Sequence, residues 1–376
     1  MNTYRYLFAI GLGLGLCANQ ASAFWPWSKN KQHGDTVIIE PACPHQEVPK
    51  VEEPKKEEGK KEEAKAPEQP MAQPPVTDAF AQAPEAGTEA PTTFNPQMLG
   101  DFIGGAACVV VPVGSGTATA KVPLAARGGF KISDNESPRP TNRVFFTYNY
   151  YNDVNGRING PDIGNIDVHR EVFGFERTFL DGDGSFGMRV PLVQQVGTDH
   201  FSDIGNLSFI GKYAFINDRA TGNVLSGGLV VTIPTGRDYE LVTGETLDPV
   251  LIQPWLGGIY NSDRLYVQGF SSVVVPTQSI DAVLLFNSIA AGYRAWQGVG
   301  GVFTSFTPTA EIHVTTPLEN RGFDACGIRY QDVVVITAGT HIGLGERSLL
   351  TIGAGTPVVG PKPFSVEGIV QFNFRF

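Results

Sequence analysis

The sequence is poor in cysteine, and its cysteines are not arranged for metal binding. Four are present among 376 residues, at positions 17, 43, 108 and 326, and no CxxC or CxxH spacing occurs. Structural zinc sites use closely spaced ligands of that kind, so the sequence argues against one. The glycine-rich stretch VGSGTATA also lacks the lysine of a phosphate-binding P-loop. We therefore predict no metal and no cofactor.

Charged residues are also scarce, at 18 %, and the formal net charge is -10. A negative balance argues against a general affinity for nucleic acid. Glycine is abundant, with 44 residues, and aromatic residues make up 10 %. This composition is typical of turn-rich β structure and disfavours a helix bundle.

The sequence lacks an apolar run long enough for a membrane-spanning helix, which needs roughly 20 residues. The N-terminal run from Leu7 to Leu16 follows Arg5 and precedes small residues at Ala21 and Ala23. A basic start, a short apolar stretch and small residues before the cut are the parts of a secretory signal peptide. We predict a signal peptide in residues 1–23.

Removal of the signal peptide leaves an odd number of cysteines in an oxidising compartment. These are Cys43, Cys108 and Cys326, and at least one of them must stay reduced or pair with another chain. Cys108 and Cys326 could join, and the sequence leaves that pairing open. A lipoprotein cleavage before Cys17 is a disfavoured alternative, because bulky Leu16 precedes it.

Residues 24–97 are rich in proline, lysine and glutamate. Lysine and glutamate nearly cancel in charge, and there are too few apolar side chains to offset the entropy of ordering the chain. We predict a disordered linker. It is either a tether that reaches a partner or a plain spacer.

Residues 98–140 have a different composition from the linker. Two apolar stretches, CVVVPV and TATAKVPLA, flank a glycine-rich turn and could pair as a hairpin. We predict a short hairpin or plug-like segment, which would plug or cap the mouth of the structure that follows.

From residue 142 onward, no stretch shows the 3.6-residue periodicity of a long helix. Twelve segments of strand length follow one another with turn residues between them. They cover residues 142–152, 166–180, 184–195, 205–216, 223–234, 249–260, 264–275, 281–296, 303–315, 331–343, 347–356 and 363–376. Most are long enough to cross a bilayer as tilted strands, which takes roughly 9 to 11 residues.

The connections between these segments alternate in length. Short turns at 181–184, 217–223, 261–264 and 345–348 are interleaved with longer loops such as 235–249 and 316–332. Antiparallel strands with short turns at one end and long loops at the other are typical of outer-membrane barrels, whose short turns are periplasmic. The linker 24–97 and the carboxyl terminus would then both be periplasmic.

Within the segments, apolar and polar residues alternate. In 303–315, for example, Phe306 and Ile312 belong to one set, and Thr307, Glu311 and His313 to the other. A soluble β-sandwich alternates in the same way. Secretion, strand length and the closing sequence FSVEGIVQFNFRF favour a sheet that closes on itself in a bilayer. We predict an all-β fold, an antiparallel transmembrane β-barrel of about twelve strands in residues 141–376.

Three stretches carry a resemblance to known proteins. The closing VQFNFRF, with Phe372, Phe374 and Phe376, resembles the signal that outer-membrane proteins present to the barrel assembly machinery. SDNESPRPTNRVFFTYNYYNDV (133–154) resembles the opening strand of outer-membrane β-barrel proteins common in planctomycete bacteria. GNLSFIGKYAF is similar to a strand of the transporter-like barrels grouped with phenol meta-pathway and long-chain fatty-acid transporters. The resemblance implies a location in the cell outer membrane.

If the apolar face of the strands points outward, a set of charged and histidine residues would line the lumen of the barrel. The set comprises Arg170, Glu176, Arg189, Lys212, Glu311, His313, His341, Glu367 and Arg375. These groups either select solutes by charge or form a packed, salt-bridged interior without an open path. Arg177 and His169 share parity with the apolar Phe173 and Phe175, so either a bulge shifts the register or they lie near the membrane interfaces.

These patterns predict a passive channel or diffusion transporter for small solutes. The alternative is a structural or adhesive barrel with a blocked lumen, whose loops contact external partners. Glu311 and His313 point the same way, but no serine is identifiable as a nucleophile, so we predict no enzyme. The expected partners are outer-membrane lipid, the barrel assembly machinery and small solutes. The sequence does not indicate an oligomeric state.

Overall fold

The computed structural model describes residues 96–101, 106–113, 115–123, 131–159, 163–197, 200–298, 300–319, 332–360 and 362–376. The chain divides into two compact units, Met1–Ala81 and Gln82–Phe376, and every described residue belongs to the second. The predicted signal peptide, nearly all of the linker, and Cys326 with its possible bond to Cys108 lie outside the described residues.

Twelve long strands form the body of the second unit. Each predicted segment corresponds to one of them, with ends that agree within three residues. They are β3 (Arg143–Asn152), β4 (Ile166–Phe179), β5 (Gly184–Gly197), β7 (Leu207–Asn217), β8 (Val224–Ile233), β11 (Leu251–Ser262), β12 (Leu265–Pro276), β13 (Leu284–Tyr293), β15 (Phe303–Pro317), β16 (Val333–Leu344), β17 (Ser348–Val359) and β18 (Val366–Arg375).

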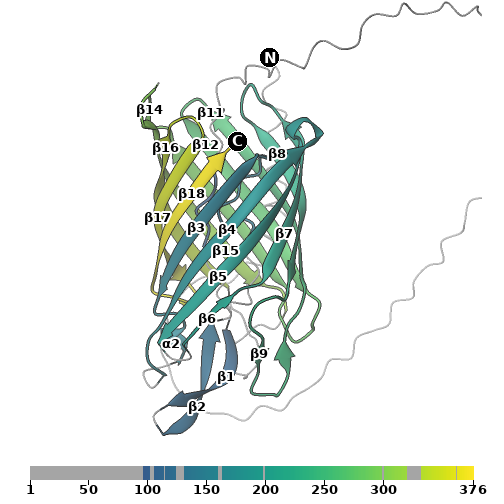
Figure 1. The fold of residues 1–376 in the computed structure, drawn as a ribbon, viewed down its shortest axis with the longest axis vertical. Helices are drawn as coiled ribbons and strands as arrows, with labels where there is room; N and C mark the ends of the chain where they lie inside the picture. The colour runs from purple at the N-terminus through teal and green to yellow at the C-terminus, as the bar shows by residue number, and fades with distance from the viewer. Residues whose placement is uncertain are drawn as a thin grey trace, which may run out of the picture. The chain divides into compact units, whose positions relative to one another are not determined.

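The strands close into a barrel (Figure 1). Each long strand pairs antiparallel with the next one along the chain, and β18 pairs with β3 in an unbroken register from Val366↔Asn152 to Arg375↔Arg143. Closure removes the two open edges that such a sheet would otherwise leave unpaired. The predicted antiparallel barrel of twelve strands is confirmed.

Short turns gather at one end of the barrel, here called the short-turn end. Asp181 and Asp263 take positive φ there, which allows the chain to reverse tightly between β4 and β5 and between β11 and β12. The same end carries η3 (Leu180–Gly182), β14 (Trp296–Gln297) and the carboxyl terminus.

The opposite, long-loop end carries the longer connections. They include α2 (Gly156–Asn159), β6 (Phe201–Ile204) and the small pair β9 (Tyr239–Glu240) and β10 (Thr246–Leu247). Residues 320–331 of the predicted loop 316–332 are outside the described residues. In the described part of the chain, no helix is both long enough and apolar enough to cross a membrane.

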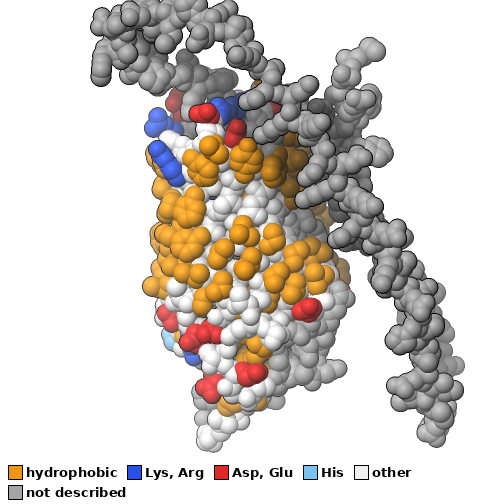
Figure 2. Space-filling model, turned by 90° about the vertical axis from the view of Figure 1, so that its right-hand side faces the viewer, with side chains coloured by type: hydrophobic (Ala, Val, Ile, Leu, Met, Phe, Trp, Pro, Cys, Tyr) orange, Lys and Arg blue, Asp and Glu red, His pale blue; other side chains and the backbone are white. Residues whose placement is uncertain are grey.

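The two faces of the barrel wall differ in polarity. On β15, Phe306 and Ile312 are 44 % and 47 % exposed, whereas Glu311 is 1 % exposed. Figure 2 shows a broad band of hydrophobic side chains on the visible face, with charged side chains above and below it. The strand period of two therefore places a band of apolar side chains outside. The inner face is largely polar, with a buried apolar cluster that includes Trp255 and Phe270.

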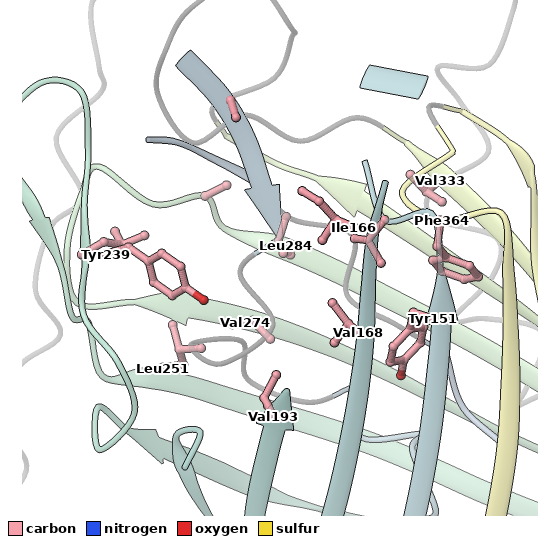
Figure 3. Packing of buried hydrophobic residues seen from close by; sticks show 14 of the residues in the cluster. Tyr151, Ile166, Val168, Val193, Tyr239, Leu251, Val274, Leu284, Val333 and Phe364 are labelled. Carbon is pink, nitrogen blue, oxygen red and sulfur yellow. The ribbon is translucent and has the colours of Figure 1, made fainter. Parts of the chain in front are cut away.

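A hairpin of β1 (Ala106–Val113) and β2 (Gly116–Pro123) lies at the long-loop end. Its Cys108 carbonyl accepts a hydrogen bond from the Val242 amide, near β9, at 3.1 Å. Ala120 joins a buried apolar cluster that includes Tyr151, Val168 and Leu284 from the barrel wall. Figure 3 shows Tyr151, Val168 and Leu284 among the side chains of this cluster. The hairpin thus packs on an apolar cluster of the barrel wall.

Candidate functional site

Two pieces of the chain without regular structure lie inside the barrel. We call residues 96–101 the first luminal segment and residues 131–140 the second luminal segment. They are joined through the hairpin, and the Met98 amide donates to the Glu136 carbonyl at 2.9 Å. Every residue from Lys131 to Ser137 is at most 2 % exposed. The barrel interior at this level is occupied by the protein's own chain.

The composition of the second luminal segment explains why it does not join the wall as a strand. Its sequence, KISDNESPRP, has small polar residues that favour turns and two prolines that cannot donate to a strand ladder. Asn135 takes a positive φ of 47°. The segment runs from the long-loop end, where Lys131 lies over the Phe286 ring, to the short-turn end, where Arg139 donates to Asn217.

The two luminal segments approach each other closely at a glycine. Gly100 has φ +83°, and a Cβ built on it would lie 2.6 Å from Asp134 Cα. Such a distance is far inside van der Waals contact, so glycine is required both for the backbone conformation and for the space.

Glu136 is the centre of the contacts between the second luminal segment and the wall. Its carboxylate accepts from Arg143 Nη2 at 2.6 Å, Arg189 Nη2 at 2.8 Å and Lys212 Nζ at 2.9 Å. These cations come from β3, β5 and β7, and all four side chains are at most 2 % exposed. Charge-assisted bonds of this kind are the strongest hydrogen bonds available in a protein.

The residues preceding Glu136 add further contacts. Asp134 accepts from Arg170 Nη1 on β4 at 2.8 Å and lies 3.5 Å from Arg189 Nη1. Asn135 donates through Nδ2 to Thr147 Oγ1 at 2.9 Å and accepts from Asn373 Nδ2 at 3.0 Å. Side chains of β3, β4, β5 and β18 therefore hold three consecutive residues of the segment.

Glu176 on β4 links the cations that surround Glu136. It accepts from Arg143 Nε and Lys212 Nζ, both at 2.9 Å, and from Ser185 Oγ at 2.7 Å. The Thr141 amide, just beyond the segment, donates to the same carboxylate at 3.1 Å. The cluster is thus continuous from the segment into the wall.

A second group of contacts holds the first luminal segment. Glu311 on β15 accepts from the Leu99 amide at 2.8 Å and from the Gly100 amide at 3.1 Å. Asp101 pairs with Lys131, which joins the two segments. His313 lies between the carboxylates, with Nε2 3.2 Å from Glu311 Oε2 and Nδ1 3.6 Å from Asp101 Oδ1.

The structure brings a serine to His313 that the sequence did not indicate. Ser288 Oγ on β13 lies 2.9 Å from His313 Nδ1, opposite the side that faces Glu311. The residue types are those of an acyl-transfer triad, but the two ring nitrogens are exchanged, because in that triad the serine binds Nε2 and the acid binds Nδ1. In addition, Ser288 donates to Ser133 Oγ of the second luminal segment at 3.2 Å, and His313 is 0 % exposed. The group is a hydrogen-bonded contact within the filled interior.

The remaining predicted lumen residues also lie in the wall. Glu367 accepts from Asn149 Nδ2 at 2.8 Å, and His341 Nδ1 lies 2.8 Å from Thr351 Oγ1. Arg375 is half-buried at the short-turn end. Of the nine predicted residues, Arg170, Arg189, Lys212, Glu311 and His313 contact the luminal segments directly.

Sequence reasoning missed Arg143, Asp134 and Glu136. Arg143 shares parity with Phe145 and Thr147 at the start of β3, and both of these are buried. Its guanidinium lies 4.6 Å from the centre of the Phe145 ring. Strict alternation applied to the first strand could have found Arg143. No periodic pattern marks the two carboxylates.

The predicted assembly-signal residues lie on the outer surface of β18 and at its end. Phe372, Phe374 and Phe376 are 38 %, 37 % and 50 % exposed. Arg177 lies 5.5 Å from the centre of the Phe376 ring. The registers of β4 with β3 and β5 are continuous, so no bulge explains the parity of Arg177 and His169, which lie towards opposite ends of β4.

No known family model matches the sequence, and no curated protein matches it. Several solved structures are similar in fold. An outer membrane channel from Pseudomonas putida F1 is 11 % identical, with 64 % of this chain and 96 % of that chain covered and a TM-score of 0.46. The KdgM porin, solved in complex with disordered oligogalacturonate, is 10 % identical over 62 % of this chain and 99 % of its own, with a TM-score of 0.39. The NanC porin is 8 % identical over 62 % of this chain and 98 % of its own, with a TM-score of 0.37. The likeness is one of barrel architecture.

Proposed function

We propose that the barrel is embedded in an outer membrane and acts as a diffusion channel for small solutes, closed by its own second luminal segment. The outer face supports the first part of the proposal. Leaving a Phe, Ile or Leu side chain in water forgoes about 1.5–3 kcal/mol of burial, and many such side chains face outward on neighbouring strands. Lipid is the solvent that covers a surface of this kind on a closed sheet.

The observation that carries the channel proposal is the position of residues 131–140. They lie along the interior between the long-loop and short-turn ends, and their contacts with the wall are made largely through side chains. A segment held in this way can leave the wall without breaking the strand ladder of the barrel. Its departure would open a path lined by the cations around Glu136 and by a buried apolar cluster that includes Trp255 and Phe270.

The ion pairs set the balance between the closed and open states. Removing one partner from a buried ion pair costs about 3–5 kcal/mol of stability, because the charge of the other partner stays buried without a counter-charge. Glu136 has three such partners. The closed state is therefore the dominant one, and passage of solute is an occasional event under resting conditions.

The same contacts favour a second candidate, a structural barrel whose lumen is permanently filled. Glu136 is bound by three cations, and Glu311 fixes two backbone amides of the first luminal segment. In that case the long loops and the hairpin would serve external partners. The two candidates differ in what happens when the central carboxylate is neutralised.

Liposome swelling with sugars of graded size separates the two candidates. Glu136→Gln removes the one carboxylate that Arg143, Arg189 and Lys212 all share. Glu176 still binds Arg143 and Lys212, but the second luminal segment loses three ion pairs to the wall and should leave it more easily. The channel proposal expects slow swelling with the wild-type protein and faster swelling with the variant. Arg177→Gln, on the exposed outer face, is the matched control and should behave as wild type. No uptake of any sugar by folded Glu136→Gln protein would reject the channel in favour of the structural barrel.

A further inference from the structure

The wall around the second luminal segment carries a cluster of positive charge. Arg143, Arg170, Arg189 and Lys212 all contact the segment, and they come from four consecutive strands of the ring, β3, β4, β5 and β7. Glu176 is the wall carboxylate bonded among them. Among the described residues, these four cations and the one wall carboxylate bonded to them carry a net positive charge.

In the closed state, the segment itself supplies the missing negative charge. Asp134 and Glu136 are two residues apart and occupy adjacent positions along the cationic wall. The donors converge on Glu136 from three strands at 2.6 to 2.9 Å, a geometry that satisfies both oxygens of a carboxylate. Arginine is suited to this role, because its planar fork matches a carboxylate.

We propose that the channel takes anionic solutes, and that small carboxylate-bearing molecules bind where Asp134 and Glu136 lie in the closed state. This inference rests on the proposed function and names its substrate class. When the segment leaves, the cationic wall loses the carboxylates of Asp134 and Glu136, and other anions are attracted to it. An incoming carboxylate can make the same bonds, so it both competes with the segment and is drawn into the path.

The acidic residues elsewhere in the lumen do not reverse this preference. Glu311 accepts hydrogen bonds from two backbone amides of the first luminal segment and lies 3.2 Å from His313 Nε2. Glu367 accepts a hydrogen bond from Asn149. These carboxylates already have donors, whereas the cations around Glu136 depend on the segment for their balance.

The test is the ion selectivity of single channels of Glu136→Gln in planar bilayers under a potassium chloride gradient. The proposal expects a reversal potential of the sign that marks chloride as the more permeant ion, and block of that current by added citrate. Adding Arg189→Gln to Glu136→Gln should shift the reversal potential towards potassium and weaken the block. Adding Arg177→Gln instead should change neither, because Arg177 lies on the outer face.

The outcomes separate this inference from the proposed function. Current that favours potassium, or that citrate does not block, overturns the assignment of anionic solutes and leaves the channel standing. No current through any folded variant overturns the channel itself. If Glu136→Gln fails to show the heat-modifiable mobility of a folded barrel, Asp134→Asn takes its place. That variant removes the carboxylate that binds Arg170 and lies 3.5 Å from Arg189. It keeps the three ion pairs of Glu136, so it should open more often than wild type and less often than Glu136→Gln, and the same selectivity criteria apply to those openings.

Discussion

Arg143, the first residue of β3, donates through Nη1 to Asn373 Oδ1 of β18 at 2.9 Å, across the seam where the first and last strands meet. The same Arg143 nitrogen donates to the Asn135 carbonyl at 2.9 Å, and Asn373 also binds the Asn135 side chain. The second luminal segment is therefore fastened to both sides of the closure. Filling the lumen and closing the barrel depend on a shared set of contacts.

The first prediction concerns this seam. Arg143→Met leaves both Glu136 and Glu176 without one of their cations, so we expect the barrel to lose about 3–5 kcal/mol of stability. The measurement is the urea concentration at which the folded gel mobility is lost in detergent. Arg177→Met removes an arginine of the neighbouring strand from the outer face and should shift that midpoint little. Equal losses in the two variants would contradict the role given to the seam contacts.

The second prediction concerns the close approach of the two luminal segments. Gly100→Ala places a Cβ 2.6 Å from Asp134 Cα, so we expect the segments to separate and the conductance to rise. Gly244→Ala is a matched control, because Gly244 has φ +81° and nothing lies within 4 Å of its Cβ position. Both variants carry the strain of a positive φ, about 1–3 kcal/mol. Only the first should change single-channel conductance, and a similar effect of both would assign it to strain alone.

The third prediction tests contact with lipid. Ile289, Ile312 and Ile336 lie opposite one another on β13, β15 and β16, and each is 42 to 49 % exposed. Ile312→Arg should destabilise the barrel in lipid by about 2–4 kcal/mol, as a cation near the bilayer midplane does. Val302→Arg, in a connection at the short-turn end where Val302 is 71 % exposed, should cost much less. Folding titrations in vesicles would measure both, and a similar cost for the two would place Ile312 outside the hydrocarbon.

The sequence predicted the wall well because the wall follows a physical rule with a short period. Each strand has one face in a polar interior and one outside, so alternation sorts Phe306 from Thr307 and Phe186 from Arg189 without any knowledge of neighbours. Long strands also tolerate errors at their ends. Every one of the twelve segments could therefore be placed within a few residues.

The interior was harder to predict, because its contacts depend on closure of the ring. Glu136 and Lys212 are 76 residues apart, and Leu99 and Glu311 are 212 apart. The second luminal segment has no periodicity of its own, so its carboxylates look like ordinary loop residues. Ser288 and His313 meet because β13 and β15 pair in a register that brings them opposite, and alternation alone does not fix that register.

The most direct test of the account is single-channel recording of the wild-type protein and Glu136→Gln side by side in planar bilayers. We expect the wild-type protein to be closed for most of the recording and the variant to stay open at a larger conductance, because the second luminal segment loses the one carboxylate that Arg143, Arg189 and Lys212 all share. A wild-type protein that conducts as freely as the variant would contradict the claim that residues 131–140 close the barrel.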